Sequence, residues 1–217
     1  MDFSVVLPYL GFLGHATWIT ILISILSLSL GLALGLIIAI MKMSGIKPFV
    51  WIADFYVWVI RGTPLLVQLF LIYFGLPQLG VELGAFLSAI LGLGINAGAY
   101  IAEIFRGGLQ AVQKGQREAA SSLGMTNAKV VWRIVLPQAL RISIPALGNQ
   151  TVMMIKDSSL ASLVTVSEIM MVSQRFAASN FAFMEFYITA AAMYLVLTTI
   201  ASALLNRFEH RMAVSER

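Results

Sequence analysis

Residues 17–41 contain no charged side chain, and this run constrains the fold more than any other feature of the sequence. A hydrocarbon core of about 30 Å requires roughly 20 apolar residues in a single α-helix. Four further stretches are long and apolar enough to span it: residues 51–76, 83–102, 142–166 and 186–206. The sequence therefore predicts an all-α polytopic membrane bundle with five transmembrane helices, folded as one domain over residues 1–217.

The composition limits the chemistry that the chain can perform. It is 59% hydrophobic and 11% charged, whereas a soluble domain carries about 25% charged residues. No cysteine is present, and the two histidines, His15 and His210, lie near opposite ends, so we expect neither a disulfide nor a metal site. The sequence has no G-x-x-x-x-G-K-S/T phosphate loop and no H-E-x-x-H or G-x-S-x-G motif. We therefore expect a protein that performs no covalent chemistry and binds no cofactor itself.

Positive charge is distributed unevenly between the loops. One set of loops carries Lys42, Lys47, Arg106, Lys114, Arg117, Lys129, Arg133, Arg141, Arg207, Arg211 and Arg217. The other set carries Arg175 alone, beside Asp2, Glu82, Glu168 and Glu185. Because cytoplasmic loops are rich in lysine and arginine, we expect the N-terminus outside and the C-terminus in the cytoplasm. The first apolar run is longer than the core of a cleavable signal peptide, so we expect it to remain as a helix.

Residues 107–141 are the basic, cytoplasmic part of the chain and are predicted to form a helix-turn-helix. We expect one helix over residues 107–123, ended by Gly124 in the left-handed conformation. Thr126 is a suitable N-cap for a second helix, which Pro137 is expected to end. The second helix has an apolar face of Val130, Val131, Ile134 and Val135. On composition alone, this segment fits docking to a partner and binding to anionic lipid equally well.

Several motifs in this segment and beyond it resemble one transporter family. Glu118-Ala119-Ala120, Gly124, Ile134 and Leu136-Pro137 have the spacing of the cytoplasmic loop signature of bacterial ABC importer permeases. Five other motifs resemble the polar amino acid branch, which serves histidine, arginine, glutamine, glutamate and cystine. They are Arg61-Gly62-Thr63-Pro64, residues 102–108, Lys114-Gly115-Gln116, residues 136–139 and residues 156–160. The resemblance covers nearly the whole chain.

The resemblance implies an assembly of several proteins in the bacterial inner membrane. Two permease subunits pair, either as a homodimer or with a sister chain. Two cytoplasmic ATPase subunits, which hold ATP and Mg, receive the helix that carries Gly115, Glu118, Ala119, Ala120 and Gly124. The two alanines would let the ATPase backbone approach closely. An extracytoplasmic binding protein delivers the polar amino acid, and neither the assembly nor its solute involves nucleic acid.

Charged residues at membrane depth are the first candidates for a solute site. Lys156 and Asp157 lie 15 residues or more beyond Arg141, about 22 Å along a helix and past mid-membrane. Asp157, Ser158 and Ser159 are expected to form a solute-facing wall. Asp157 shares one helix face with Gln150, Met154 and Ala161. Alternatively, Lys156 and Asp157 compensate each other inside the bundle. Gln150 has two candidate roles: recognition of the solute side chain, or a hydrogen bond between helices.

Two further polar groups interrupt the spans. Asn96, Tyr100 and Glu103 share one face of the third helix, and we expect Glu103 to pair with Arg106 rather than act as a gate. Pro64 is expected to break the second helix. The break is either a hinge or binding wall, or a fixed kink from which Arg61 reaches the cytoplasmic interface. Outside the membrane, residues 167–185 suggest a short amphipathic helix on the membrane surface or a plain connector.

Two functions from other classes fit the sequence without the resemblance. One is a self-contained ion-coupled carrier or channel that uses Lys156 and Asp157 as its relay. The other is a membrane scaffold whose basic segment docks a soluble complex without transport. Neither explains why the loop signature is present in full.

Overall fold

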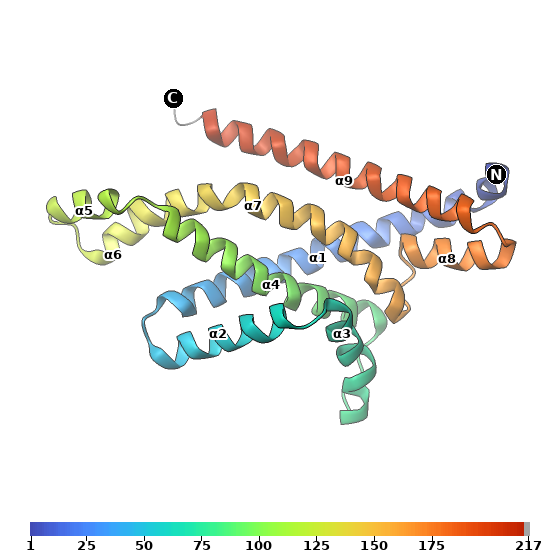
Figure 1. Ribbon diagram of the computed structural model, residues 1–217, viewed down its shortest axis with the longest axis horizontal. Coiled ribbons are helices and arrows are strands. Elements are labelled where there is room, and N and C mark those ends of the chain that lie inside the picture. Colours follow the sequence, from blue (N-terminus) through green and yellow to red (C-terminus); the bar gives the residue numbers. More distant parts are fainter. Residues whose placement is uncertain (215–217) are drawn as a thin grey trace.

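The computed structural model describes the backbone of residues 1–214 and the side chains of residues 1–209, and this part contains helices and no strand (Figure 1). The long elements are α1 (Leu10–Met43), α2 (Lys47–Gly62), α4 (Ala85–Ala111), α7 (Leu136–Asp157), α8 (Ile169–Asn180) and α9 (Phe183–Val214). Short ones are η1 (Phe3–Tyr9), α3 (Leu65–Phe70), η2 (Leu71–Gly75), η3 (Leu76–Leu79), α5 (Lys114–Ser122), α6 (Asn127–Val130), η4 (Val131–Val135) and η5 (Ser158–Val164). Three residues named in the sequence analysis, His210, Arg211 and Arg217, lie outside the described side chains.

The number of candidate membrane spans is compatible with the prediction of five. Four helical stretches are long and apolar enough to cross a bilayer, and α2 with the segment from Leu65 to Leu79, bent by 104° at the break, counts as a fifth if the bent pair is one span. α9 returns from the N-terminal end of the bundle toward the end that holds α5 and α6 (Figure 1). The two ends of the described chain therefore lie at opposite ends of the molecule, as an odd number of spans requires.

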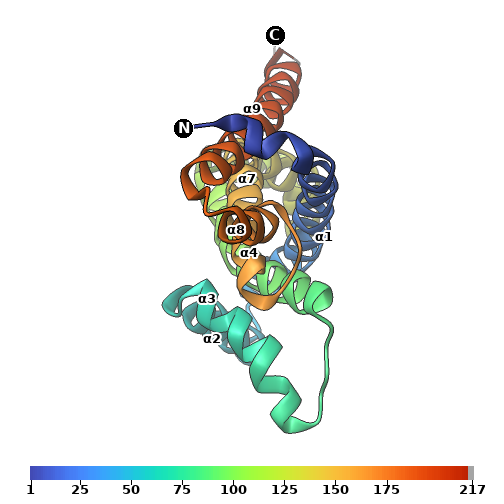
Figure 2. The same cartoon turned by 90° about the vertical axis from the view of Figure 1, so that its right-hand side faces the viewer.

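Helices α1, α4 and α7 form the centre of the bundle, with α2 and α3 to one side and α9 to the other (Figure 2). Glycine makes the close crossings possible. A Cβ atom on Gly35 of α1 would lie 2.5 Å from Ile101 Cγ2 of α4. On α4, a Cβ on Gly94 would lie 2.7 Å from Leu30 Cδ2, and one on Gly98 would lie 2.8 Å from the Tyr56 hydroxyl. The small residues thus set the distance between helices.

The helix predicted over residues 107–123 is wrong. α4 continues to Ala111, and the chain is extended at Val112 and Gln113 before α5 begins at Lys114. Val112 is 5% exposed and packs in a small core with Leu109 and Val135. The break between α4 and α5 points the Val112 side chain inward. Packing within residues 107–141, called the hairpin from here on, therefore outweighs the tendency of the chain to continue as one helix.

The turn after α5 forms as predicted. Gly124 has a φ of +76°. The Gly124 amide donates to the Ser121 carbonyl and the Met125 amide to the Ala120 carbonyl, which is the pair of bonds that ends a helix at a left-handed residue. Thr126 occupies the N-cap position of α6, although its side chain makes no capping hydrogen bond.

Pro137 does not end the second helix of the hairpin, contrary to the prediction. The helical path is continuous from Asn127 to Val164. A π turn, η4, directly precedes the proline, and the Leu136 amide donates to the Val131 carbonyl five residues back. The wider turn moves backbone carbonyls away from the proline ring, so the helix accommodates it. Pro137 is the second residue of α7.

α8 is the short helix predicted between the last two spans, but it does not lie flat at a membrane surface. It runs alongside α9 and contacts α1 (Figures 1 and 2). Its face of Ile169, Ser173 and Ala177 is fully buried. Glu168 caps the helix by accepting a hydrogen bond from the Met171 amide at 2.8 Å, and it also accepts one from the Tyr194 hydroxyl. α8 is therefore part of the bundle.

Candidate functional site

The break between α2 and α3 is held in place by one glutamine. Thr63 and Pro64 are extended, and Pro64 would otherwise clash with the Ile60 carbonyl. Gln68, on α3, folds back so that its Nε2 donates to that carbonyl and to Thr63 Oγ1, each at 2.8 Å. Asn96 Nδ2 of α4 donates to Gln68 Oε1 at 3.1 Å. These bonds satisfy the backbone group that the proline leaves without a donor and fix the bend against α4.

Beside this break lies a cavity of about 460 Å³. Three parts of the chain line it: the break itself, α4 through Asn96 and Tyr100, and α7. Arg61 enters it from the end of α2, and its guanidinium carbon lies 5.2 Å from the centre of the Tyr100 ring. This cation–π contact holds Arg61 at the cavity wall, and the break beside it is a fixed kink held by Gln68 and Asn96.

The face that α7 presents to the cavity differs from the predicted one. Gln150, Met153, Asp157 and Leu160 line it. Met154 and Ala161, which were predicted to share the face of Asp157, are 2% and 0% exposed and belong to the hydrophobic core. The helix is rotated by part of a turn from the predicted setting, which keeps Gln150 and Asp157 on the cavity wall.

Ser158 and Ser159 are not part of that wall, so their predicted position is wrong. The Ser158 side chain is 0% exposed and donates to the Ile155 carbonyl at 2.7 Å. The Ser159 hydroxyl donates to the Lys156 carbonyl, also at 2.7 Å. Both hydroxyls serve the helix end where α7 tightens into the 3₁₀ helix η5. Their donors are engaged within the chain and do not face the cavity.

Lys156 lies on a different side of α7 from Asp157. It lines a groove against α9, with Thr199, Ser202 and Asn206. No ion pair joins Lys156 to Asp157 among the described side chains. Mutual compensation by contact is therefore absent from the structure, although the two side chains are neighbours in sequence.

Glu103 makes the predicted ion pair with Arg106, and Lys42 extends this pair into a network. Arg106 Nη2 lies 2.6 Å from Glu103 Oε2, and Lys42 Nζ lies 2.6 Å from Glu103 Oε1. Lys42 also pairs with Asp54 Oδ1 at 3.0 Å. Glu103 does not line the cavity. The network joins α1, α2 and α4 near the end of the bundle that carries the hairpin.

The hairpin end presents some of the predicted coupling residues and buries one of them. Gly115, Glu118 and Ala119 are exposed, and a Cβ on Gly115 would meet no atom within 4 Å. Ala120 is 4% exposed and packs in the small core of the hairpin, so it is not available for close approach by another chain. Leu123, beside Gly124, is 82% exposed. The outer side of α5 is therefore an open surface with an apolar side chain at its end.

Comparison with known proteins decides the family. Residues 31–214 match the family described as "Binding-protein-dependent transport system inner membrane component". The chain belongs to this family. It is 37% identical to the arginine transport system permease protein ArtQ of Bacillus subtilis, over 98% of this chain and 97% of that protein. It is 41% identical to the L-cystine permease protein TcyB of the same organism, over 92% and 86%. It is 37% identical to the glutamine permease protein GlnP of Escherichia coli K12, over 98% of each.

Solved structures agree with this assignment. An amino acid ABC transporter determined with histidines has a chain that superimposes with a TM-score of 0.94, at 42% identity, over 97% of this chain and 99% of its own. A chain of the MetNI methionine ABC transporter, in an inward-facing conformation, superimposes with a TM-score of 0.77 at 19% identity, over 94% and 97%. The second match shows that the fold extends to relatives with little sequence similarity. This chain is a membrane permease subunit of the ABC amino acid importer type.

Proposed function

We propose that this chain forms the membrane pathway of an ATP-driven importer, and that a polar amino acid passes through the cavity beside the α2–α3 break. The observation that carries the proposal is that Arg61 and Asp157, from helices far apart in the sequence, line the same cavity. A free amino acid carries a carboxylate and an ammonium group. A site with one guanidinium and one carboxylate offers each of them a partner of opposite charge.

The geometry supports a role for each wall of the cavity. Arg61, held by Tyr100, would bind the solute carboxylate. Asp157 would accept hydrogen bonds from an ammonium or another cationic group. Asn96 and Gln150 are 8% and 7% exposed and add amide groups at the cavity wall. The relatives named for arginine, cystine and glutamine support a polar amino acid as the solute.

We further propose that α5 couples this chain to a separate ATPase. The exposed surface of Gly115, Glu118 and Ala119, with the protruding Leu123, supports the docking of a partner. In the complete transporter, two permease subunits would carry two ATPase subunits that hold ATP and Mg. An extracytoplasmic binding protein would supply the solute on the side of the N-terminus, and the C-terminus would be cytoplasmic.

The experiment that tests this function is an affinity purification of the tagged chain from mildly solubilised membranes. Partners are identified by mass spectrometry for the wild type, Glu118→Lys and Gly124→Asp. We expect an ATPase with a phosphate-binding loop to copurify with the wild type and to be lost with both variants. Glu82→Lys is the control, because it reverses an equally exposed charge away from the hairpin. Recovery of the wild-type chain alone, or an ATPase retained by both hairpin variants, would contradict the proposal.

A further inference from the structure

A second cavity lies at the other end of the molecule, between the start of α1 and α8. Its volume is about 670 Å³. Phe12 and His15 line it from α1, and Arg175 and Phe176 line it from α8. The rings of Phe12 and Phe176 have centroids 5.4 Å apart, so the two helices meet through aromatic contacts. His15, Ser167 and Arg175 are all exposed and supply the polar side chains of this groove.

The groove carries a cation without a counter-charge. Among the described side chains, Arg175 makes no ion pair or hydrogen bond. The neighbouring acidic residues have other partners: Glu168 accepts from the Met171 amide and the Tyr194 hydroxyl, and Glu185 accepts from the Asp2 amide. None of the residues that line the groove is acidic. Its charge is therefore complementary to an anion.

The rise of the two helices places the side chains of Arg175 and His15 at the same depth along the bundle. The Ile169 amide at the start of α8 donates to Thr20 Oγ1 of α1 and marks a common depth on the two helices. Arg175 lies six residues from Ile169, and His15 lies five residues from Thr20. At a rise of 1.5 Å per residue, these are displacements of about 9 Å and about 8 Å. Both point toward the N-terminal end of the bundle, because α8 and α1 run in opposite directions there (Figure 1).

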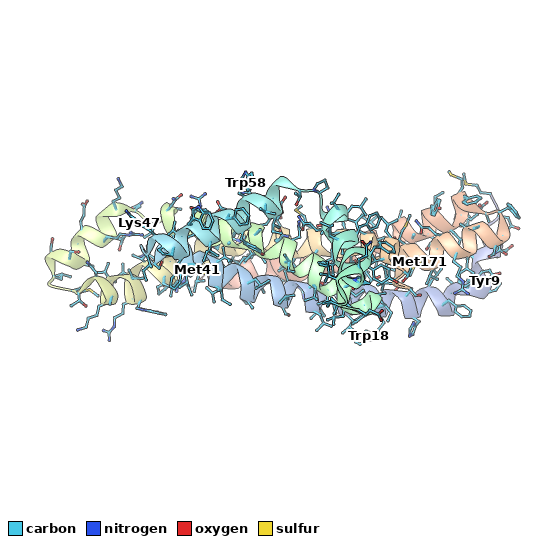
Figure 3. All side chains as sticks on the ribbon, turned by 90° about the horizontal axis from the view of Figure 1, so that it is seen from below. Tyr9, Trp18, Met41, Lys47, Trp58 and Met171 are labelled. Carbon is cyan, nitrogen blue, oxygen red and sulfur yellow. The ribbon has the colours of Figure 1, made fainter. Side chains whose placement is uncertain are left out.

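That level corresponds to the headgroup layer of a bilayer. His15 precedes Lys42 by 27 residues of α1, or about 40 Å. A bilayer with its headgroups is about 40–45 Å thick. Lys42 lies in the ion-pair network near the basic end of the bundle, so His15 reaches the opposite headgroup layer. Trp18, which is 60% exposed and projects away from α1, lies one turn deeper, as expected for an interfacial tryptophan (Figure 3).

We propose that this groove binds the headgroup of an anionic phospholipid in the outer leaflet. The phosphate lies between Arg175, which pairs with its charge, and His15, which donates a hydrogen bond. Phe12, 61% exposed beside this pair, contacts the first carbons of the acyl chains. The lipid thereby adds a polar link between α1 and α8 beside their aromatic contact. This site is distinct from the solute cavity and does not depend on the proposed transport function.

The test uses the transporter purified with the partners that accompany it and reconstituted in nanodiscs. The midpoint of thermal unfolding is measured in phosphatidylcholine alone and with added phosphatidylglycerol, for the wild type, Arg175→Gln and His15→Gln. Lys47→Gln is the control, an exposed lysine at the opposite end of the molecule (Figure 3). We expect phosphatidylglycerol to raise the midpoint of the wild type and the control by several degrees. The rise should disappear in Arg175→Gln and fall by about half in His15→Gln, with all midpoints equal in phosphatidylcholine.

Three outcomes would overturn the proposal. One is an equal response to phosphatidylglycerol in the wild type and Arg175→Gln. Another is the same rise with soluble glycerol phosphate, which would show an anion site that does not require a lipid. The third is an unchanged lipid response together with weaker binding of the extracytoplasmic binding protein by Arg175→Gln, which would make the groove a protein docking surface. Arg175→Lys keeps the charge and should keep most of the rise, and His15→Gln carries the test if Arg175→Gln already unfolds early in phosphatidylcholine.

Discussion

Lys156 and Asp157 are neighbours on α7, yet they belong to different parts of the molecule. Asp157 lines the cavity that contains Arg61 and Gln150, whereas Lys156 faces a groove against α9. Successive side chains on an α-helix point about 100° apart, since the helix has 3.6 residues per turn. Charge at membrane depth therefore indicates that a site is near, but the face of the helix decides which residue belongs to it. The structure therefore places Asp157, and not Lys156, at the wall of the proposed solute cavity.

The largest effect is expected from Asp157→Asn. The substitution keeps the shape of the side chain and removes its charge, so the hydrogen bond to a cationic group loses about 1.5–3 kcal/mol. Uptake into proteoliposomes that contain the assembled transporter and its binding protein should fall about ten- to a hundredfold. The copurified ATPase should remain. A loss of less than about twofold would remove Asp157 from the solute path.

A smaller effect is expected from Gln68→Met, which tests whether the bend positions Arg61 opposite Asp157. The Ile60 carbonyl and Thr63 hydroxyl would lose their donor, at a cost of about 1–3 kcal/mol. Thermal stability should fall by several degrees and uptake by several-fold. Gln78→Met is the matched control, because that exposed amide makes one long contact of 3.4 Å to the Phe74 carbonyl. Equal behaviour of the two variants would show that Gln68 does not hold the break.

Lys156→Gln should change uptake by about twofold at most, because the amine lies outside the solute cavity. Transport is measured as for Asp157→Asn, in the same vesicles and normalised to the amount of assembled complex. If Lys156→Gln and Asp157→Asn reduced uptake equally, the two residues would act together. An ion relay through this pair would then replace the solute site at Asp157 as the explanation of these charges at membrane depth.

The smallest effect is expected from Ser158→Ala. The hydroxyl is buried and bonds a carbonyl of its own helix, so its loss removes one local hydrogen bond of about 1 kcal/mol. Uptake and solute preference should match those of the wild type within experimental error. A change in solute preference would restore Ser158 to the cavity wall and contradict the orientation of α7 in the structure.

The sequence predicted the features that depend on local chemistry. The lengths of the apolar runs gave the spans, Gly124 the turn of the hairpin, and the spacing of Glu103 and Arg106 their ion pair. The polar residues at the cavity wall, Arg61, Asn96, Gln150 and Asp157, were also singled out, because polar groups in a membrane are few. Their meeting in one cavity was not predicted, since that depends on how the helices pack.

The errors arose where tertiary packing decides between local alternatives. On a helix, residues three apart and residues four apart both share a face. Only the packing of α7 against its neighbours determines that Met153, and not Met154, lines the cavity. Gln68 was missed because it reaches Ile60 only after the chain bends by 104°. Lys42 and Glu103 are 61 residues apart, a separation at which sequence spacing carries no information about contact. Pro137 was misjudged because a π turn accommodates it.

The most direct test of the solute site is equilibrium binding to the purified transporter without its binding protein. Arginine, cystine and glutamine, the solutes named for its relatives, are each titrated against the wild type, Asp157→Asn and Lys156→Gln. We predict that at least one binds the wild type and Lys156→Gln with similar affinity and binds Asp157→Asn at least tenfold more weakly. Equal affinity for the wild type and Asp157→Asn would contradict the assignment of this cavity as the solute site.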